Sequence, residues 1–154
     1  MTEALASKTC TPCRGGIPPL THEQAELFHA QAPDWQLAEE ARRIERSFQF
    51  RNFREALTFV HEIGELAEAE GHHPNICFGW GNATVSLQTK KIKGLHENDF
   101  IMATKIDRIF ARAAAAGTSS VWSHAYTELV RKLSSRSAEI LFCGSADAVG
   151  RQAV

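Results

Sequence analysis

The chain has 154 residues, enough for one domain and too few for two of ordinary size. Apolar residues make up 44% and charged residues 23% of the sequence, which is typical of a globular protein. A formal net charge of -1 gives no electrostatic basis for binding nucleic acid. No apolar run approaches the roughly 18 residues that cross a bilayer, so we expect a cytoplasmic protein without membrane contact.

Residues 1–19 contain the pair Cys10 and Cys13 in a C-x-x-C arrangement and end in two prolines. Such a pair can be half of a zinc site or a redox pair. A closed zinc site needs four ligands, however, and the sequence has no second C-x-x-C and no H-x-x-x-H. We therefore expect no metal site, and interpret this segment as a flexible arm with reduced thiols.

The first elements of the folded part are a helix and two strands. Thr21 is a suitable N-cap with a glutamine three residues later, which predicts a helix over about 22–31. Residues 35–37 and 43–50 are predicted strands, and in the second one apolar and polar side chains alternate as in a half-buried strand. Arg46 breaks this alternation on the apolar side.

The clearest helix in the sequence is predicted over 53–70. Asn52 can cap it, Gly71 supplies a left-handed end, and Pro74 forbids its continuation. Its apolar residues recur at helical spacing and predict the buried face: Phe53, Ala56, Leu57, Val60, Ile63, Gly64 and Ala67.

Two adjacent histidines, His72 and His73, therefore stand just beyond a helix C-terminus. The helix dipole favours the protonated imidazole there. Histidine is also the side chain whose unperturbed pKa is nearest neutrality, so the pair is a candidate for proton transfer. Structural capping by the histidines is the alternative that the local sequence leaves open.

The rest of the chain completes the pattern. Strands are predicted over 75–80 and 84–89, followed by a helix over about 97–114 with Asp99 in its first turn. The order helix-strand-strand-helix-strand-strand-helix predicts an α+β fold, a four-stranded antiparallel sheet with three helices on one face. We expect one domain over 20–114 and a partly helical or disordered extension over 115–154.

Several of these motifs, in this order and spacing, resemble the pterin-4a-carbinolamine dehydratases over about residues 10–110. The resemblance includes the run Glu68-x-x-x-His72-His73-Pro74, then Trp80, and then Asp99 within GLHENDF. It also includes the segments CTPCRGG and FRNFREALTFVHEIGELAEAEGHHPN.

The resemblance implies a 4a-hydroxytetrahydrobiopterin dehydratase, a hydro-lyase that eliminates water from 4a-hydroxytetrahydropterin to give quinonoid dihydropterin. This reaction recycles the tetrahydrobiopterin of aromatic amino acid hydroxylases, and the family uses no metal or other cofactor. The implied partners are a pterin substrate, a hydroxylase pathway, and further copies of the chain in a homodimer or homotetramer. The implied catalytic residues are His72, His73 and Asp99, and the implied substrate-binding residues are Glu68, His73, Pro74, Trp80 and Lys90.

One position departs from the family's pattern, because Lys90 stands where the family has a further histidine or a tryptophan. A lysine with an ordinary pKa near 10.4 is a poor acid-base group at neutral pH. We therefore expect weakened turnover with His72 as the main acid-base group. The alternative is a weakly active or inactive family member that acts as a binding or assembly protein, of the RuBisCO assembly factor or transcriptional coactivator type.

Overall fold

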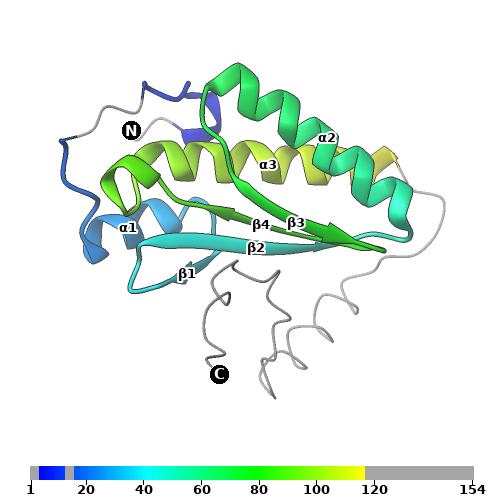
Figure 1. Cartoon of the computed structure of the whole chain (residues 1–154), viewed down its shortest axis with the longest axis horizontal. Coiled ribbons are helices and arrows are strands. Elements are labelled where there is room, and N and C mark those ends of the chain that lie inside the picture. Colours follow the sequence, from blue (N-terminus) through cyan, green and yellow to red (C-terminus); the bar gives the residue numbers. More distant parts are fainter. Residues whose placement is uncertain (1–3, 13–15, 117–154) are drawn as a thin grey trace, which may run out of the picture. The chain divides into compact units, whose positions relative to one another are not determined.

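The computed structural model describes residues 4–12 and 16–116, which form the predicted α+β fold (Figure 1). The predicted element order is confirmed: α1 (His22–His29), β1 (Gln36–Ala38), β2 (Arg43–Gln49), α2 (Phe53–Glu70), β3 (Asn75–Gly79), β4 (Asn82–Leu87) and α3 (Glu97–Ala116). Two short 3-10 turns accompany them, η1 (Leu5–Ser7) and η2 (Lys90–Ile92). The predicted extension lies outside the described residues beyond Ala116.

The four strands form one antiparallel sheet in the order β1-β2-β4-β3. In this register Val85 of β4 pairs with Arg46 of β2 and with Ile76 of β3. Helices α2 and α3 lie side by side across one face of the sheet (Figure 1). The core lies in this layer, and its largest fully buried side chains include Trp35, Phe48, Phe59, Phe100 and Met102.

Helix α2 begins and ends as its sequence predicts. The Asn52 side chain accepts a hydrogen bond from the backbone N–H of Glu55 at 3.0 Å, and Gly71 ends the helix in the left-handed region.

The face of α2 that is buried differs in part from the predicted one. Ala56, Phe59, Ile63 and Ala67 are buried, whereas the predicted Phe53 and Leu57 are 42% and 47% exposed. The helix has more apolar residues than its contacts with the sheet and α3 can cover, so periodicity alone could not locate the buried strip.

The contacts of Arg46 explain why a charged residue stands on the apolar side of β2. Its guanidinium contacts the carboxylates of Asp107 at 2.7 Å and Asp34 at 3.0 Å, and lies 4.8 Å from the ring centroid of Phe48. Burial raises the pKa of Asp107, an effect that the guanidinium of Arg46 and the indole N–H of Trp35 oppose. A cation on the apolar face is thus accommodated by ion pairing and by stacking on an aromatic ring.

The expectation of a flexible N-terminal arm is wrong for residues 4–12. Leu5 is 1% exposed and belongs to the core, and its backbone N–H donates to the Gln31 side chain at 3.2 Å. Residues 8–11 contact the ends of α2 and α3. Composition suggested mobility, but the arm's backbone donors find polar partners on the domain. Cys13 lies outside the described residues, so the C-x-x-C pair stays untested.

Among the helices of residues 4–12 and 16–116, none has the length and hydropathy required to span a membrane.

Candidate active site

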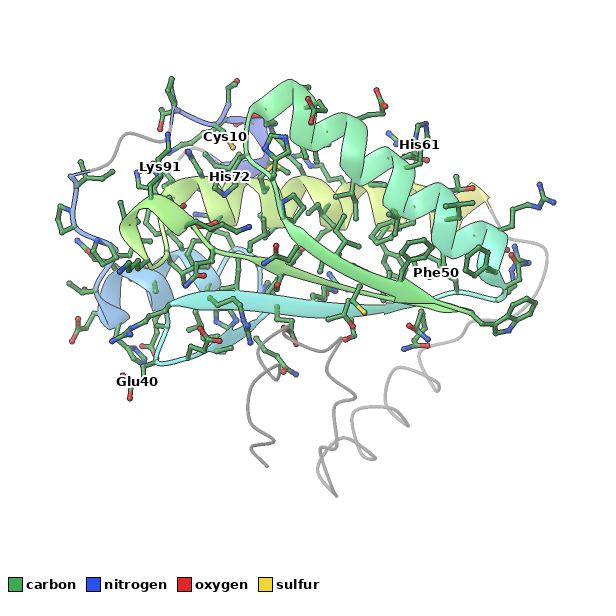
Figure 2. All side chains as sticks on the ribbon, viewed as in Figure 1. Cys10, Glu40, Phe50, His61, His72 and Lys91 are labelled. Carbon is green, nitrogen blue, oxygen red and sulfur yellow. The ribbon has the colours of Figure 1, made fainter. Side chains whose placement is uncertain are left out.

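The end of α2 presents the two histidines. Gly71 has φ 63° and ψ 26°, and its N–H bonds to the Ala67 carbonyl. The N–H of His72 also donates to that carbonyl, at 3.2 Å. This left-handed end turns the chain away from the helix axis, and after Pro74 the chain continues as β3. In Figure 2, His72 lies at the end of α2 from which β3 departs.

His72 is a buried histidine paired with a buried carboxylate. The residue is 5% exposed, Asp99 is 0% exposed, and the distance from Nε2 of His72 to Oδ1 of Asp99 is 2.7 Å. An ionised carboxylate only accepts hydrogen bonds, so this contact places a proton on Nε2. The contact with Asp99 therefore determines which ring nitrogen of the neutral imidazole carries the proton.

Three donors fix the carboxylate of Asp99. One oxygen accepts from His72, and the other accepts from the Thr89 hydroxyl at 2.9 Å and from the backbone N–H of His96 at 2.8 Å. Thr89 is itself 4% exposed. Asp99 is 0% exposed and enclosed by these donors, so it is positioned to orient the ring of His72.

His73 forms a second histidine–carboxylate pair, in a different environment. Its Nε2 lies 2.8 Å from Oε1 of Glu68, and the two side chains are 60% and 79% exposed. The family resemblance implies that Glu68 is a substrate-binding residue, and in the structure its carboxylate contacts His73. The site therefore contains one buried and one exposed imidazole, each with its own carboxylate.

Pro74 and Lys90 adjoin this site. Pro74 is half-buried directly after His73, and Lys90 is exposed at the start of η2. The residue before Lys90 is Thr89, whose hydroxyl holds Asp99. Lys90 thus stands at the rim of the site, one residue from its buried part.

Trp80 is not brought to the histidines within one chain. Strand β3, five residues or about 16 Å long, separates the two. The neighbouring Gly81 carbonyl accepts the N–H of Phe50 at 2.7 Å, and Phe50 lies at the opposite end of α2 from His72 (Figure 2). Trp80 is 74% exposed there, so this arrangement of the described residues does not bring the implied substrate-binding Trp80 beside the histidines.

The sequence did not single out Thr89 or the capping role of residue 96. The spacing of His96 and Asp99 matches a capping box, in which the third helical residue bonds back to the backbone at the cap. Histidine is not one of the usual capping residues, so the sequence carries no ordinary capping signal at this position. In the structure, Nδ1 of His96 accepts the N–H of Asn98 at 3.2 Å.

Comparison with known proteins identifies the family to which the chain is similar. Residues 18–109 match the family model described as pterin 4 alpha carbinolamine dehydratase. Proteins of Cupriavidus pinatubonensis and Aromatoleum aromaticum, provisionally named pterin-4-alpha-carbinolamine dehydratases, are 61% and 60% identical over 111 and 107 residues. These alignments cover 72% and 70% of this chain and 96% of each relative.

A solved structure from Brucella melitensis, described as a transcriptional coactivator/pterin dehydratase, has a TM-score of 0.57 and 29% sequence identity. It covers 60% of this chain and 98% of the other chain. The family model matches more than half of the chain and the curated relatives match at high identity. The chain belongs to the pterin-4-alpha-carbinolamine dehydratase family.

Proposed function

We propose that this protein catalyses the dehydration of 4a-hydroxytetrahydropterin to quinonoid dihydropterin. Family membership supports a pterin substrate and a dehydratase reaction. The observation that carries the proposal is the pair of adjacent imidazoles, each bound to its own carboxylate, at the end of one helix. Two imidazoles at one site can serve as acid and base in the same elimination.

The reaction requires two proton transfers. The 4a-hydroxyl must gain a proton to leave as water while the bond from C4a to oxygen breaks. The N5–H proton must be removed, and its electron pair forms the double bond between N5 and C4a. An acid and a base near neutral pKa are therefore sufficient for the chemistry.

We assign proton transfer to His72. Asp99 orients its ring and stabilises the imidazolium that forms when the ring takes a proton. The exposed His73, oriented by Glu68, is our candidate for the second proton transfer and for contact with the pterin ring as it enters from solvent. Pro74 fixes the chain direction after His73, and Lys90 is placed to bind the substrate at the rim.

The experiment that tests the proposal is a dehydratase assay on the wild type, His72→Ala and Lys90→His. We expect a wild-type rate above spontaneous dehydration, and a loss of about a hundredfold or more in His72→Ala because its acid-base group is removed. Lys90→His restores an imidazole at the rim, so it should raise kcat. A wild-type rate equal to the spontaneous one would contradict the proposal.

A binding or assembly role is the second candidate, and Lys90 in place of the family's third imidazole favours it. In that case the wild type should bind a pterin or a protein partner without turnover, and Lys90→His should create activity. The Brucella relative's description pairs a coactivator role with dehydratase activity, which is a statement about that protein.

Three further properties stay predictions from the family resemblance. They are assembly as a homodimer or homotetramer, service to an aromatic amino acid hydroxylase in tetrahydrobiopterin recycling, and a cytoplasmic location. Sedimentation of the purified full chain would test the first directly.

A further inference from the structure

The N-terminal segment 8–11, which we call the strap, contacts both helix ends that hold the buried pair of the site. His72 follows the end of α2 by two residues, and Asp99 is the third residue of α3. Their 2.7 Å contact therefore depends on how these two ends are placed relative to each other.

The strap contacts the end of α2 through Glu70, the last residue of that helix. The backbone N–H of Cys10 donates to one Glu70 oxygen at 2.8 Å, and the ammonium of Lys105 on α3 donates to the other. The side chains of Glu70 and Lys105 are only 10% and 17% exposed. Glu70 thereby joins the strap, α2 and α3 at one point.

The strap contacts the start of α3 at Glu97 and Asn98, the first two residues of that helix. Lys8 forms an ion pair with Glu97 at 2.6 Å. The Asn98 side chain accepts the N–H of Thr11 at 3.1 Å and donates to the Thr11 carbonyl at 2.7 Å. Asn98 is 1% exposed and directly precedes Asp99, so this two-way contact fixes the residue beside the buried carboxylate.

We propose that the strap is part of the active site and that Asn98 is a positioning residue, which through the strap keeps Asp99 in contact with His72. The proposal rests on the proposed function for its catalytic consequence. Proton transfer tolerates misplacement of about 0.5 Å at most, and two buried helix ends held by a third segment meet that requirement better than two helix ends alone. The chain upstream of the sheet domain then contributes directly to catalysis.

The test compares Asn98→Ala with Arg108→Ala in the full chain. Arg108 also holds the N-terminal segment, through the Ala6 carbonyl at 3.2 Å, but it contacts neither Glu70 nor Asp99 among the described residues. The first readout is the NMR resonance of the His72 Nε2–H proton, which requires no substrate. The second is kcat and KM for the dehydration.

In Asn98→Ala we expect the His72 Nε2–H resonance to broaden or vanish, and kcat to fall about tenfold with KM little changed. In Arg108→Ala the resonance and kcat should stay as in the wild type. If Asn98→Ala folds and leaves both readouts unchanged, the proposal is overturned.

Asn98→Asp keeps the test decisive if the alanine variant does not fold. It retains the acceptor for Thr11 N–H, and a carboxylate is favourable in the first turn of a helix. It loses the donor to the Thr11 carbonyl, so we expect the His72 Nε2–H resonance to broaden, but less than in Asn98→Ala. An unchanged resonance would contradict the proposed role of the strap. If the wild type has no dehydratase activity but the resonance responds as described, the strap stands and the proposed function fails.

Discussion

The two histidine–carboxylate pairs of the site have the same chemistry and opposite exposure. His72 and Asp99 are nearly enclosed, whereas His73 and Glu68 are mostly in solvent. Water and salt screen an exposed pair, which typically contributes about 0–1 kcal/mol. A buried pair is screened far less, and breaking it leaves an uncompensated polar group.

Asp99→Asn and Glu68→Gln should therefore differ sharply. Asp99→Asn should lower kcat about a hundredfold or more, because an amide does not stabilise the His72 imidazolium. Glu68→Gln should change kcat by about threefold or less, because solvent already surrounds that pair. Equal losses in the two variants, measured as kcat for the dehydration, would contradict the division into a buried and an exposed imidazole.

Thr89 supplies a second test at the residue scale. Thr89→Val removes the hydroxyl that donates to Asp99 but keeps the side chain's shape. We expect a loss of about 1 kcal/mol in the free energy of unfolding and about a tenfold fall in kcat. Thr89→Ser retains the donor and should stay close to the wild type in urea unfolding and in kcat. A Thr89→Val protein as active as Thr89→Ser would show that the hydroxyl is dispensable.

At the scale of elements, the site is made by the end of one helix and the start of another. The end of α2 carries the histidines, and the start of α3 carries Asp99. Glu70, at the end of α2, also forms an ion pair with Lys105, which lies further along α3. Burial raises the pKa of Glu70, but the hydrogen bond from Cys10 N–H and the ammonium of Lys105 outweigh burial, so the pKa is lowered overall.

The lowered pKa of Glu70 predicts an acid-sensitive junction. A carboxyl group whose pKa is lower in the folded state contributes stability above its unfolded value of about 4.5, and loses it as pH falls through the folded pKa. Between pH values of about 5 and 3, the free energy of unfolding should thus fall less steeply in Glu70→Gln than in the wild type. Urea unfolding across this range measures the difference.

Glu65→Gln is the control for the Glu70 prediction. Glu65 is exposed on the same helix, so its replacement should leave the slope of stability against pH unchanged. Parallel slopes for the wild type and Glu70→Gln would show that the contacts of Glu70 with the strap and with Lys105 contribute no acid sensitivity.

At the scale of the described fold, one cluster of phenylalanine rings in the core lies away from the candidate site. The rings of Phe48, Phe50, Phe59 and Phe110 form a cluster in which the contacting pairs have centroid separations of 4.7 to 5.9 Å. Phe50 lies at the end of α2 opposite to His72 (Figure 2). Core packing and site chemistry should therefore be separable by substitution.

Phe59→Ala should remove about 3–5 kcal/mol of stability, because Phe59 is 1% exposed and its loss leaves a cavity among the clustered rings. Phe53→Ala, at a residue 42% exposed on the same helix, should cost about 1 kcal/mol or less. Below its unfolding temperature, folded Phe59→Ala should keep a near-normal kcat. Thermal unfolding and the dehydratase assay check both parts, and similar stability losses at the two positions would contradict this placement of the core.

Local signals in the sequence were sufficient for the elements and for the histidine pair. The cap at Asn52, the left-handed end at Gly71 and the alternation in β2 each depend on residues within a few positions of one another. The sequence therefore determined the order of helices and strands, and the family motif identified His72, His73 and Asp99 as candidates.

Only the tertiary structure decided which side chains of the candidate site contact one another and which of them are buried. It separated the two histidines into a buried and an exposed one, left Trp80 at the far end of β3, and enclosed Asp99 among its donors. It also docked residues 4–12, which composition had suggested would be flexible. The physical reason is that these contacts join residues far apart in the chain, and burial depends on how helices pack rather than on the residues beside them.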